Sequence, residues 1–396
     1  MSKTVVFFTW EFWSGPIHIS AHALAKTFVE DGWKVAFVTV PLSPLHSLLS
    51  SSLTTNRRKE LGRDKGEWFM EDRLWAYVPN EWLPPQNQPS NKVLGFFYKF
   101  LRKLLPQSSP NLVELLKENG FDEPTLSILD CAYFLPVLSK IYPQKVIQRI
   151  TDLTDAFPNM ASQYGRWECL GAQQADLVTY SSQGLKEYAQ ALGARKITFI
   201  PHGVDLDLFS KPQGVPIEYK QMNSPIAVYV GTIGEWFDFE AMEVAAKALP
   251  EVQFVIIGLG NKCPVDLEKW VVDFPNLHFL GMRPHSQIPA YLQHADVGLI
   301  PFRLTGNEAF VNAINPIKVY EYLACHLPIV SSPLPSLTAL KQNHQPLFFY
   351  EMPADVVTQL GNALMCKKET SCKTGNALGW KVVKNQILDS LYESKS

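Results

Sequence analysis

Short apolar runs recur along the chain, and amphipathic segments separate them. The first two runs, TVVFFT (residues 4–9) and VAFVTV (residues 35–40), flank a turn-like WSGP and an amphipathic segment from Ile17 to Glu30. This order predicts a β-α-β unit. Because the apolar runs do not alternate with polar residues, the sequence predicts strands of a parallel sheet that helices cover on both faces.

The alternation continues in two series. The first series adds apolar runs at 126–129, 145–150, 177–181 and 196–200. The second series has runs at 226–230, 253–257, 277–280, 297–300, 329–331 and 347–350, with helical stretches at 239–248, 288–294, 317–324 and 354–365. Because strands alternate with helices in both series, the sequence predicts an α/β protein with two doubly wound, Rossmann-like domains. Its ligands are expected in the cleft between the domains, beyond the carboxyl ends of the strands.

A polar, proline-bearing segment separates the two series. At 396 residues the chain is also too long for one ordinary core. We therefore expect a first domain over residues 1–214 and a second over residues 215–378. The apolar spacing of the tail predicts a C-terminal helix, within residues 379–396, that packs back on the first domain.

Composition narrows the possible partners. The net charge of −2 does not indicate the basic surface that binds nucleic acid. The six cysteines have no CxxC spacing, so neither a disulfide framework nor a zinc site is predicted. Because no apolar leader is present either, we expect the protein in the cytoplasm. No apolar run is long enough to span a bilayer, so membrane contact is expected only at the surface. No GxGxxG follows the first strand, so the dinucleotide fingerprint is absent.

Four segments resemble the two-Rossmann-domain (GT-B) glycosyltransferases. They are ADLVTYSSQGLKEYAQALGARKITFIPHGVDLDLF (175–209), YVGTIGEWFDFE (229–240), FLGMRPHSQIPAYLQHADVGLIPF (279–302) and NPIKVYEYLACHLPIVSS (315–332). The similarity is to glycosyltransferase-4-like enzymes that make teichuronic acid and xanthan-type glucuronosyl linkages. It implies transfer of a sugar from a nucleotide-diphosphate sugar, a UDP-sugar, to a glycan or lipid-linked saccharide in polysaccharide biosynthesis. The nucleotide sugar is then a substrate, and neither a cofactor nor a metal is implied.

Two positions depart from the pattern of the retaining members of that group. An upstream glutamate is replaced by Ala313, and the usual Arg/Lys pair is replaced by the EWFD of residues 235–238. The sequence therefore leaves open whether the anomeric configuration is retained or inverted. Asp238 is expected to cap the helix that begins near Phe239.

The donor site is expected in the second domain. Lys318 follows Pro316 near the start of a short helix, where free backbone N–H groups and a lysine suit a diphosphate. Glu321, one turn on, would accept from ribose hydroxyls; alternatively, the two side chains form a surface salt bridge. Arg283 is expected to contact the nucleobase and Arg303 the sugar or phosphate, although solvated arginines would fit equally. The full set of expected donor residues is Gly231, Thr232, Ile233, Gly234, Arg283, Arg303, Ile317, Lys318 and Glu321.

The acceptor site is expected in the first domain. Asp152 and Asp155 follow the strand at 145–150, where an inverting transferase needs a general base, although aspartate is also common in turns. The choice between the two stays open. His18 is a candidate acceptor contact, with an ordinary helical histidine as the alternative. His18 and His22 have metal-ligand spacing but no third ligand, and the DLD at 205–207 lies in a turn, so no metal site is predicted.

Residues 91–107 (NKVLGFFYKFLRKLLPQ) form a basic amphipathic pattern. Such a helix can lie in a membrane surface, or it can pack on its own domain with solvated lysines. Two alternative hypotheses for the function remain open. One is a nucleotide-sugar epimerase of the same fold, and the other is a sugar-nucleotide-binding protein without catalytic activity.

Overall fold

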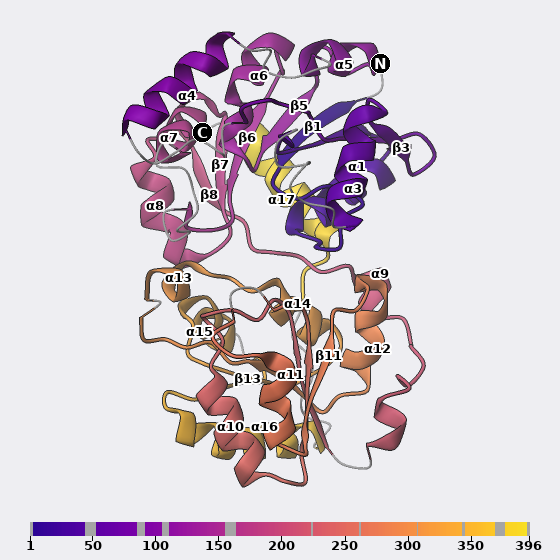
Figure 1. Ribbon diagram of the computed structural model, residues 1–396, viewed down its shortest axis with the longest axis vertical. Coiled ribbons are helices and arrows are strands. Elements are labelled where there is room, and N and C mark those ends of the chain that lie inside the picture. Colours follow the sequence, from indigo (N-terminus) through magenta and orange to yellow (C-terminus); the bar gives the residue numbers. More distant parts are fainter. Residues whose placement is uncertain are drawn as a thin grey trace. The chain divides into compact units, whose positions relative to one another are not determined.

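The computed structural model describes residues 3–43, 53–84, 92–104, 111–154, 164–222, 225–260, 263–306, 308–342, 345–368 and 377–393. The chain divides into two compact units, of which one comprises Met1–Pro201 with Trp380–Ser396 and the other His202–Gly379. Each unit is a mainly parallel sheet with helices packed against it (Figure 1). Residues 202–214 thus belong to the second unit by their contacts, whereas the sequence analysis assigned them to the first domain.

The first unit contains an eight-stranded sheet in the order β3-β4-β2-β1-β5-β6-β7-β8. Its strands are β1 (Thr4–Thr9), β2 (Lys34–Thr39), β3 (Glu67–Phe69), β4 (Leu74–Tyr77), β5 (Leu126–Leu129), β6 (Val146–Ile150), β7 (Leu177–Tyr180) and β8 (Ile197–Phe199). The strands pair in parallel, with the exception of β3, which is antiparallel to β4. The sequence analysis did not predict β3 and β4, because strands of three and four residues carry little periodic signal.

Helices alternate with the strands of this sheet. They are α1 (Ser20–Glu30), α3 (Leu53–Arg63), α4 (Lys92–Leu104), α5 (Leu112–Glu118), α6 (Leu135–Ile141), α7 (Tyr164–Gln174), α8 (Lys186–Ala191) and α17 (Trp380–Tyr392). The first helix starts at Ser20 rather than at the expected Ile17. Ile19 is extended and donates its N–H to the His22 ring at 3.2 Å, so the chain becomes helical only after it.

The second unit contains a six-stranded parallel sheet in the order β11-β10-β9-β12-β13-β14. Its strands are β9 (Ile226–Val230), β10 (Gln253–Ile257), β11 (Leu277–Gly281), β12 (Val297–Ile300), β13 (Ile329–Ser331) and β14 (Leu347–Phe349). Its helices are α9 (Leu206–Phe209), α10 (Phe239–Ala248), α11 (Leu267–Trp270), α12 (Ile288–Gln293), α13 (Glu308–Ala313), α14 (Ile317–Ala324), α15 (Pro335–Gln342) and α16 (Val356–Lys368). Relative to chain order this is the 3-2-1-4-5-6 arrangement of a doubly wound fold.

The buried strand residues explain why both sheets form. Val5, Val6, Phe7 and Phe8 of β1 are fully buried, and Phe7 packs edge-on against Phe28 of α1 at 5.8 Å. Strands buried on both faces form parallel sheets, as the unbroken apolar runs predicted. The predicted cap of α10 is confirmed, because the Asp238 carboxylate accepts the Ala241 N–H at 3.0 Å.

The cysteines differ in part from the expectation. Cys131, Cys169, Cys263 and Cys325 form no disulfide bond, but Cys366 is disulfide-bonded. Among the residues that the structure describes, no helix is long and apolar enough to cross a bilayer.

The C-terminal helix packs back on the first unit, as predicted. α17 lies along α1 (Figure 1), and Lys384 forms an ion pair with Asp31 just after the end of α1. The Lys384 side chain is only 1% exposed and its ammonium lies 5.9 Å from the centre of the Phe28 ring. Lys381 also reaches Asp31, at 3.7 Å, but its side chain is 72% exposed. The buried pair therefore anchors α17 more firmly than the exposed one.

We expect Lys384→Ala to destabilise the first unit by about 2 to 4 kcal/mol, because it removes a buried pair and leaves a void beside Phe28. Lys381→Ala, which removes an exposed partner of the same carboxylate, should cost less than about 0.5 kcal/mol. Urea unfolding monitored by circular dichroism compares the two variants. Equal midpoints for both variants and the wild type would contradict the anchoring role of Lys384.

Candidate functional site

Three glycines lie at the carboxyl edge of the second sheet. Gly231 follows β9, Gly258 follows β10, and Gly281 ends β11. The Gly231 N–H donates to Ile257 O at 2.8 Å and the Gly258 N–H to Gly281 O at 3.0 Å. A β-carbon at residue 258 would collide with the carbonyl oxygen of Gly231. The three strand ends are thus held closer together than bulkier residues would permit.

Lys318 lies against this glycine edge. A β-carbon at residue 231 would collide with Cε of Lys318, and Gly231 has a positive φ of 152°. The lysine side chain therefore occupies the space that a larger residue at 231 would fill. The sequence analysis selected Gly231 and Lys318 separately, and the structure brings them into direct contact.

The helix that carries Lys318 is fixed by the strands next to it. The Tyr322 hydroxyl accepts the N–H of Val230, the residue before Gly231, at 2.9 Å and donates to Leu299 O at 3.3 Å. At the other end, Asn315 donates to the Tyr320 hydroxyl at 2.9 Å. The residue before the helix, Pro316, makes no side-chain cap. The first N–H groups of α14 therefore have no capping side chain among the described residues, which favours an anion there.

The positive charge of Lys318 is only partly balanced by the carboxylate of Glu321. Burial lowers the pKa of the Lys318 ammonium below the usual value for lysine, and the Glu321 carboxylate opposes that shift. No ion pair joins the two side chains among the described residues. Instead, Glu321 pairs with His285, whose Nε2 lies 3.0 Å from Oε1 of Glu321. The surface salt bridge that was the alternative for Lys318 and Glu321 is therefore absent from the described contacts, and His285 is a neighbour that the sequence analysis did not single out.

The loop after β9 is tied to its neighbours by backbone groups. The Tyr229 hydroxyl donates to Thr232 O at 2.8 Å, and Ile233 is fully buried, with its N–H donating to Leu259 O at 3.0 Å. The Gly234 carbonyl accepts the Phe237 N–H at 3.0 Å. These bonds hold residues 231–234 in one conformation at the carboxyl edge.

The two arginines expected at the donor site differ in their surroundings. Arg283 pairs with Glu218 at 3.0 Å and donates to the Tyr291 hydroxyl at 3.2 Å. The Arg303 backbone N–H donates to Trp236 O at 2.7 Å, which places its exposed side chain next to the loop after β9. Arg283 is thus largely occupied within the second unit, whereas the Arg303 side chain is solvated.

A cavity of about 410 Å³ opens at the same edge. Its lining comes from the segment after β10 and from the end of β11 with the residue after it: Gly258, Leu259, Gly260, Cys263, Val265, Asp266, Leu267, Glu268, Phe279, Gly281 and Met282. Its volume lies within the range of about 300–1,000 Å³ for small-molecule sites, and apolar side chains, glycine backbone and two carboxylates line it. Because Gly258 also touches Gly231, the cavity adjoins the position of Lys318.

The carboxyl edge of the first sheet carries a buried charged group that the sequence analysis missed. Arg149, on β6, pairs with Asp130, which follows β5, at 2.9 Å, and donates to the Ser20 hydroxyl at 2.8 Å. The Arg149 and Asp130 side chains are only 6% and 4% exposed. Burial raises the pKa of the Asp130 carboxyl, Arg149 opposes that rise, and the Asp152 carboxylate adds to it. Asp152 therefore lies near this pair.

Of the two candidate bases, only Asp152 lies among the described residues. Asp152 is exposed and accepts from the Thr151 hydroxyl at 3.1 Å. Two residues on, the Thr154 hydroxyl donates to the buried Glu168 at 2.8 Å, which fixes the segment that carries Asp152. Asp155 lies outside the described residues.

The histidines of the first unit pack on one another. His18 lies before α1, not on it, and its exposed ring is 4.9 Å from that of His22. Nε2 of the buried His22 is 3.1 Å from Phe12 O. The residues that the structure describes contain no cluster of three or more His, Cys, Asp or Glu side chains that could hold a metal. The DLD at 205–207 forms a helix start, because Asp205 accepts the Leu208 N–H at 3.1 Å.

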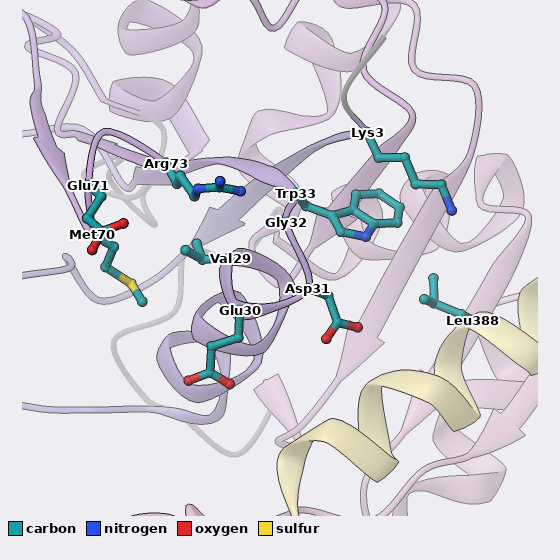
Figure 2. Close-up of a pocket in the computed structure, with 10 residues that line it drawn as sticks. All are labelled: Lys3, Val29, Glu30, Asp31, Gly32, Trp33, Met70, Glu71, Arg73 and Leu388. Atoms are coloured by element: carbon teal, nitrogen blue, oxygen red, sulfur yellow. The ribbon is translucent and has the colours of Figure 1, made fainter.

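A larger cavity, of about 950 Å³, lies at the opposite edge of the first sheet. Figure 2 shows its lining, with Lys3 just before β1, Trp33 just before β2 and Leu388 from α17. Ligands of open α/β sheets bind beyond the carboxyl ends of the strands, whereas this cavity lies at the amino ends. It contains none of the predicted site residues.

Comparisons with known proteins show which families the two units resemble. Residues 7–181 match the family model for the N-terminal domain of the glucuronosyltransferase GumK, and residues 224–365 match the model for glycosyl transferases group 1. The putative teichuronic acid biosynthesis glycosyltransferase TuaH of Bacillus subtilis is 27% identical over 223 residues, 52% of this chain and 55% of the relative. The UDP-glucuronate:glycolipid 2-beta-glucuronosyltransferase of Xanthomonas campestris is 27% identical over 198 residues, 50% and 46% of the two chains. The matched region thus spans about half the length of these relatives.

Solved structures resemble the whole chain. Sucrose-phosphate synthase from Thermosynechococcus elongatus has a TM-score of 0.65 at 15% identity and covers 98% of both chains. Anabaena HepE in complex with UDP-glucose has a TM-score of 0.65 at 14% identity, covering 98% of this chain and 99% of its own. WaaG, a glycosyltransferase of lipopolysaccharide biosynthesis, has a TM-score of 0.56 at 13% identity, covering 98% and 100%. The predicted GT-B fold and the resemblance to its glycosyltransferases are confirmed.

The contact between Gly231 and Lys318 can be tested by stability. We expect Gly231→Ala to lower the free energy of unfolding by about 1 to 3 kcal/mol, because the new methyl group displaces the lysine side chain. In a Lys318→Ala background the same change should cost clearly less, which a double-mutant cycle measures. Gly361→Ala is the control, since the space around Gly361 in α16 is open and alanine favours a helix. Additive effects of the two substitutions would argue against the contact.

Proposed function

We propose that this chain, with its GT-B fold and its matches to glycosyltransferase models, is a glycosyltransferase that uses a UDP-sugar as donor. The acceptor is a glycan or a lipid-linked saccharide in polysaccharide biosynthesis, and the transfer takes place in the cytoplasm. The observation that carries the proposal is the partly buried Lys318 ammonium packed on Gly231, beside an uncapped helix start and a cavity of nucleoside size.

The second unit would hold the donor. Lys318 and the first N–H groups of α14 would bind the diphosphate, and the cavity lined by Gly258 and Met282 would hold the nucleoside. Glu321, held by His285, would accept from the ribose hydroxyls. That HepE, a protein of the same fold, has been solved in complex with UDP-glucose supports this class of ligand. During transfer the positive charge of Lys318 would stabilise the departing UDP.

The first unit would hold the acceptor. Asp152 is a solvent-accessible carboxylate at the carboxyl edge of its sheet, next to the buried Asp130–Arg149 pair. If the configuration inverts, Asp152 would remove the proton of the acceptor hydroxyl, and Asp155 is the alternative base. Ala313 offers no carboxylate at the position of the upstream glutamate of retaining relatives, which favours inversion.

Binding of UDP tests the donor site. We expect Lys318→Ala to weaken UDP binding roughly 10- to 100-fold, because a charge-assisted contact with the diphosphate is lost. Lys341→Ala, at an exposed position of the same unit, should leave the affinity unchanged. Isothermal titration calorimetry with UDP measures both variants.

The same titration at rising pH provides a second control. Because the pKa of Lys318 is lowered by burial, the ammonium should lose its proton, and the site its affinity, at a lower pH than an ordinary lysine would require. Lys318→Ala keeps the other titrating groups of UDP and of the protein, so the difference between the two profiles belongs to the lysine. Identical profiles would remove Lys318 from the diphosphate site.

Sugar transfer tests the base. Asp152→Asn should lower kcat about 10²- to 10⁴-fold and leave UDP affinity unchanged, because the amide cannot accept the acceptor proton. Asp155→Asn is measured in parallel, and Asp122→Asn, at an exposed position on the same unit, is the control. UDP release from radiolabelled UDP-sugars in the presence of acceptor gives the rate. Full turnover in both Asp152→Asn and Asp155→Asn would rule out this assignment, and UDP binding without release would indicate a non-catalytic binder.

A further inference from the structure

The helix α4 presents an apolar face to solvent. Six of its side chains, Val93, Leu94, Phe96, Phe97, Phe100 and Leu101, each expose between 47% and 67% of their surface. A surface helix of a globular protein normally turns its apolar stripe toward the core. Contiguous exposed apolar patches of this kind mark sites of interaction with a partner or a membrane.

The contacts of α4 show that the exposed face is turned away from the unit. Among the α4 residues whose burial the structure describes, Gly95 is the buried one, and the Tyr98 hydroxyl donates to Pro84 O at 2.9 Å. At about 100° per residue, Gly95 and Tyr98 lie on the side opposite Val93, Phe97 and Phe100. None of the other described elements packs extensively against α4, which lies at the outside of its unit (Figure 1).

The charge of the segment indicates the partner. Residues 91–107 contain Lys92, Lys99, Arg102 and Lys103 and no acidic residue, in a chain whose net charge is −2. Trp82, two residues before the Pro84 that accepts from Tyr98, is 50% exposed, and tryptophan is enriched at membrane interfaces. A basic helix with an aromatic apolar face suits an anionic lipid surface, where lysines meet head groups and phenylalanines enter the acyl boundary.

We propose that α4 docks the first unit onto an anionic lipid bilayer, with its apolar face in the interface and its lysines on the head groups. This docking would place the unit assigned to the acceptor at the surface that presents a lipid-linked saccharide. In that respect the inference rests on the proposed function. Docking itself is a property of α4 and does not require sugar transfer.

Vesicle co-sedimentation of the full chain tests the docking. Wild-type protein should bind vesicles of phosphatidylglycerol mixed with phosphatidylcholine, and bind pure phosphatidylcholine more weakly. The triple variant Phe96→Ser, Phe97→Ser, Phe100→Ser should lower the partition coefficient at least tenfold, because the apolar area that enters the interface is lost. Lys99→Gln should lower it about fivefold on the anionic vesicles alone. Lys186→Gln, at an exposed position on the same unit, is the matched control.

Three further measurements make each outcome decisive. The melting temperature of the triple variant should equal that of the wild type, and a fall of several degrees would show that another part of the chain covers the face. Light scattering should give the same mass for both proteins, and a dimer lost in the variant would assign the face to a second copy. UDP affinity should be unchanged in the variants, so failure of docking and failure of the donor site are distinguishable. Absence of wild-type binding to anionic vesicles, or equal binding by the triple variant, would overturn the proposal.

Discussion

The arrangement of the second unit depends on one close contact, a lysine side chain packed on a glycine backbone. Lys318 lies where a β-carbon of Gly231 would be, so the ammonium is partly withdrawn from water. Withdrawing a charge from solvent is costly unless it is compensated, and here the compensation by Glu321 is incomplete because that carboxylate pairs with His285. A diphosphate would supply the missing negative charge. The Tyr322 hydroxyl, which ties α14 to the end of β9, keeps the contact in place.

In the first unit, by contrast, two buried charged side chains have partners within the same unit. Arg149 is satisfied by Asp130 and Ser20, and Glu168 by Thr154 and by the Tyr188 hydroxyl. Buried pairs of this kind contribute little net stability, but breaking one is costly, so they hold the segments that bear them in one arrangement. Asp152 lies near Asp130 and two residues before Thr154, and it remains exposed to solvent. An exposed carboxylate on a rigid support suits proton transfer to a base, because the support fixes its position and solvent allows an acceptor to approach.

The apolar residues of α17 and α4, two helices of the first unit, are used in opposite ways. α17 buries Val383, Ile387 and even Lys384, and so closes the unit with the end of the chain. α4 turns its phenylalanines outward. Both segments have apolar residues at helical spacing, and only the surroundings decide which face is covered. The same pattern thus yields a structural helix in one place and a solvent-exposed apolar surface in the other.

The sequence by itself determined the elements whose signal is local. Unbroken apolar runs defined β1, β9, β10 and β12 to the residue, because strands buried on both faces need no partner to be recognised in the sequence. The Asp238 cap was predictable for the same reason, since it acts within four residues. Only the tertiary structure decided which distant residues meet: Lys318 with Gly231, Glu321 with His285, Arg149 with Asp130, and Arg283 with Glu218. Those contacts depend on the order in which parallel strands join the sheet, which no local pattern encodes. The orientation of α4 likewise depends on what packs against it, because its periodicity fixes an apolar face but not the side on which the rest of the protein lies.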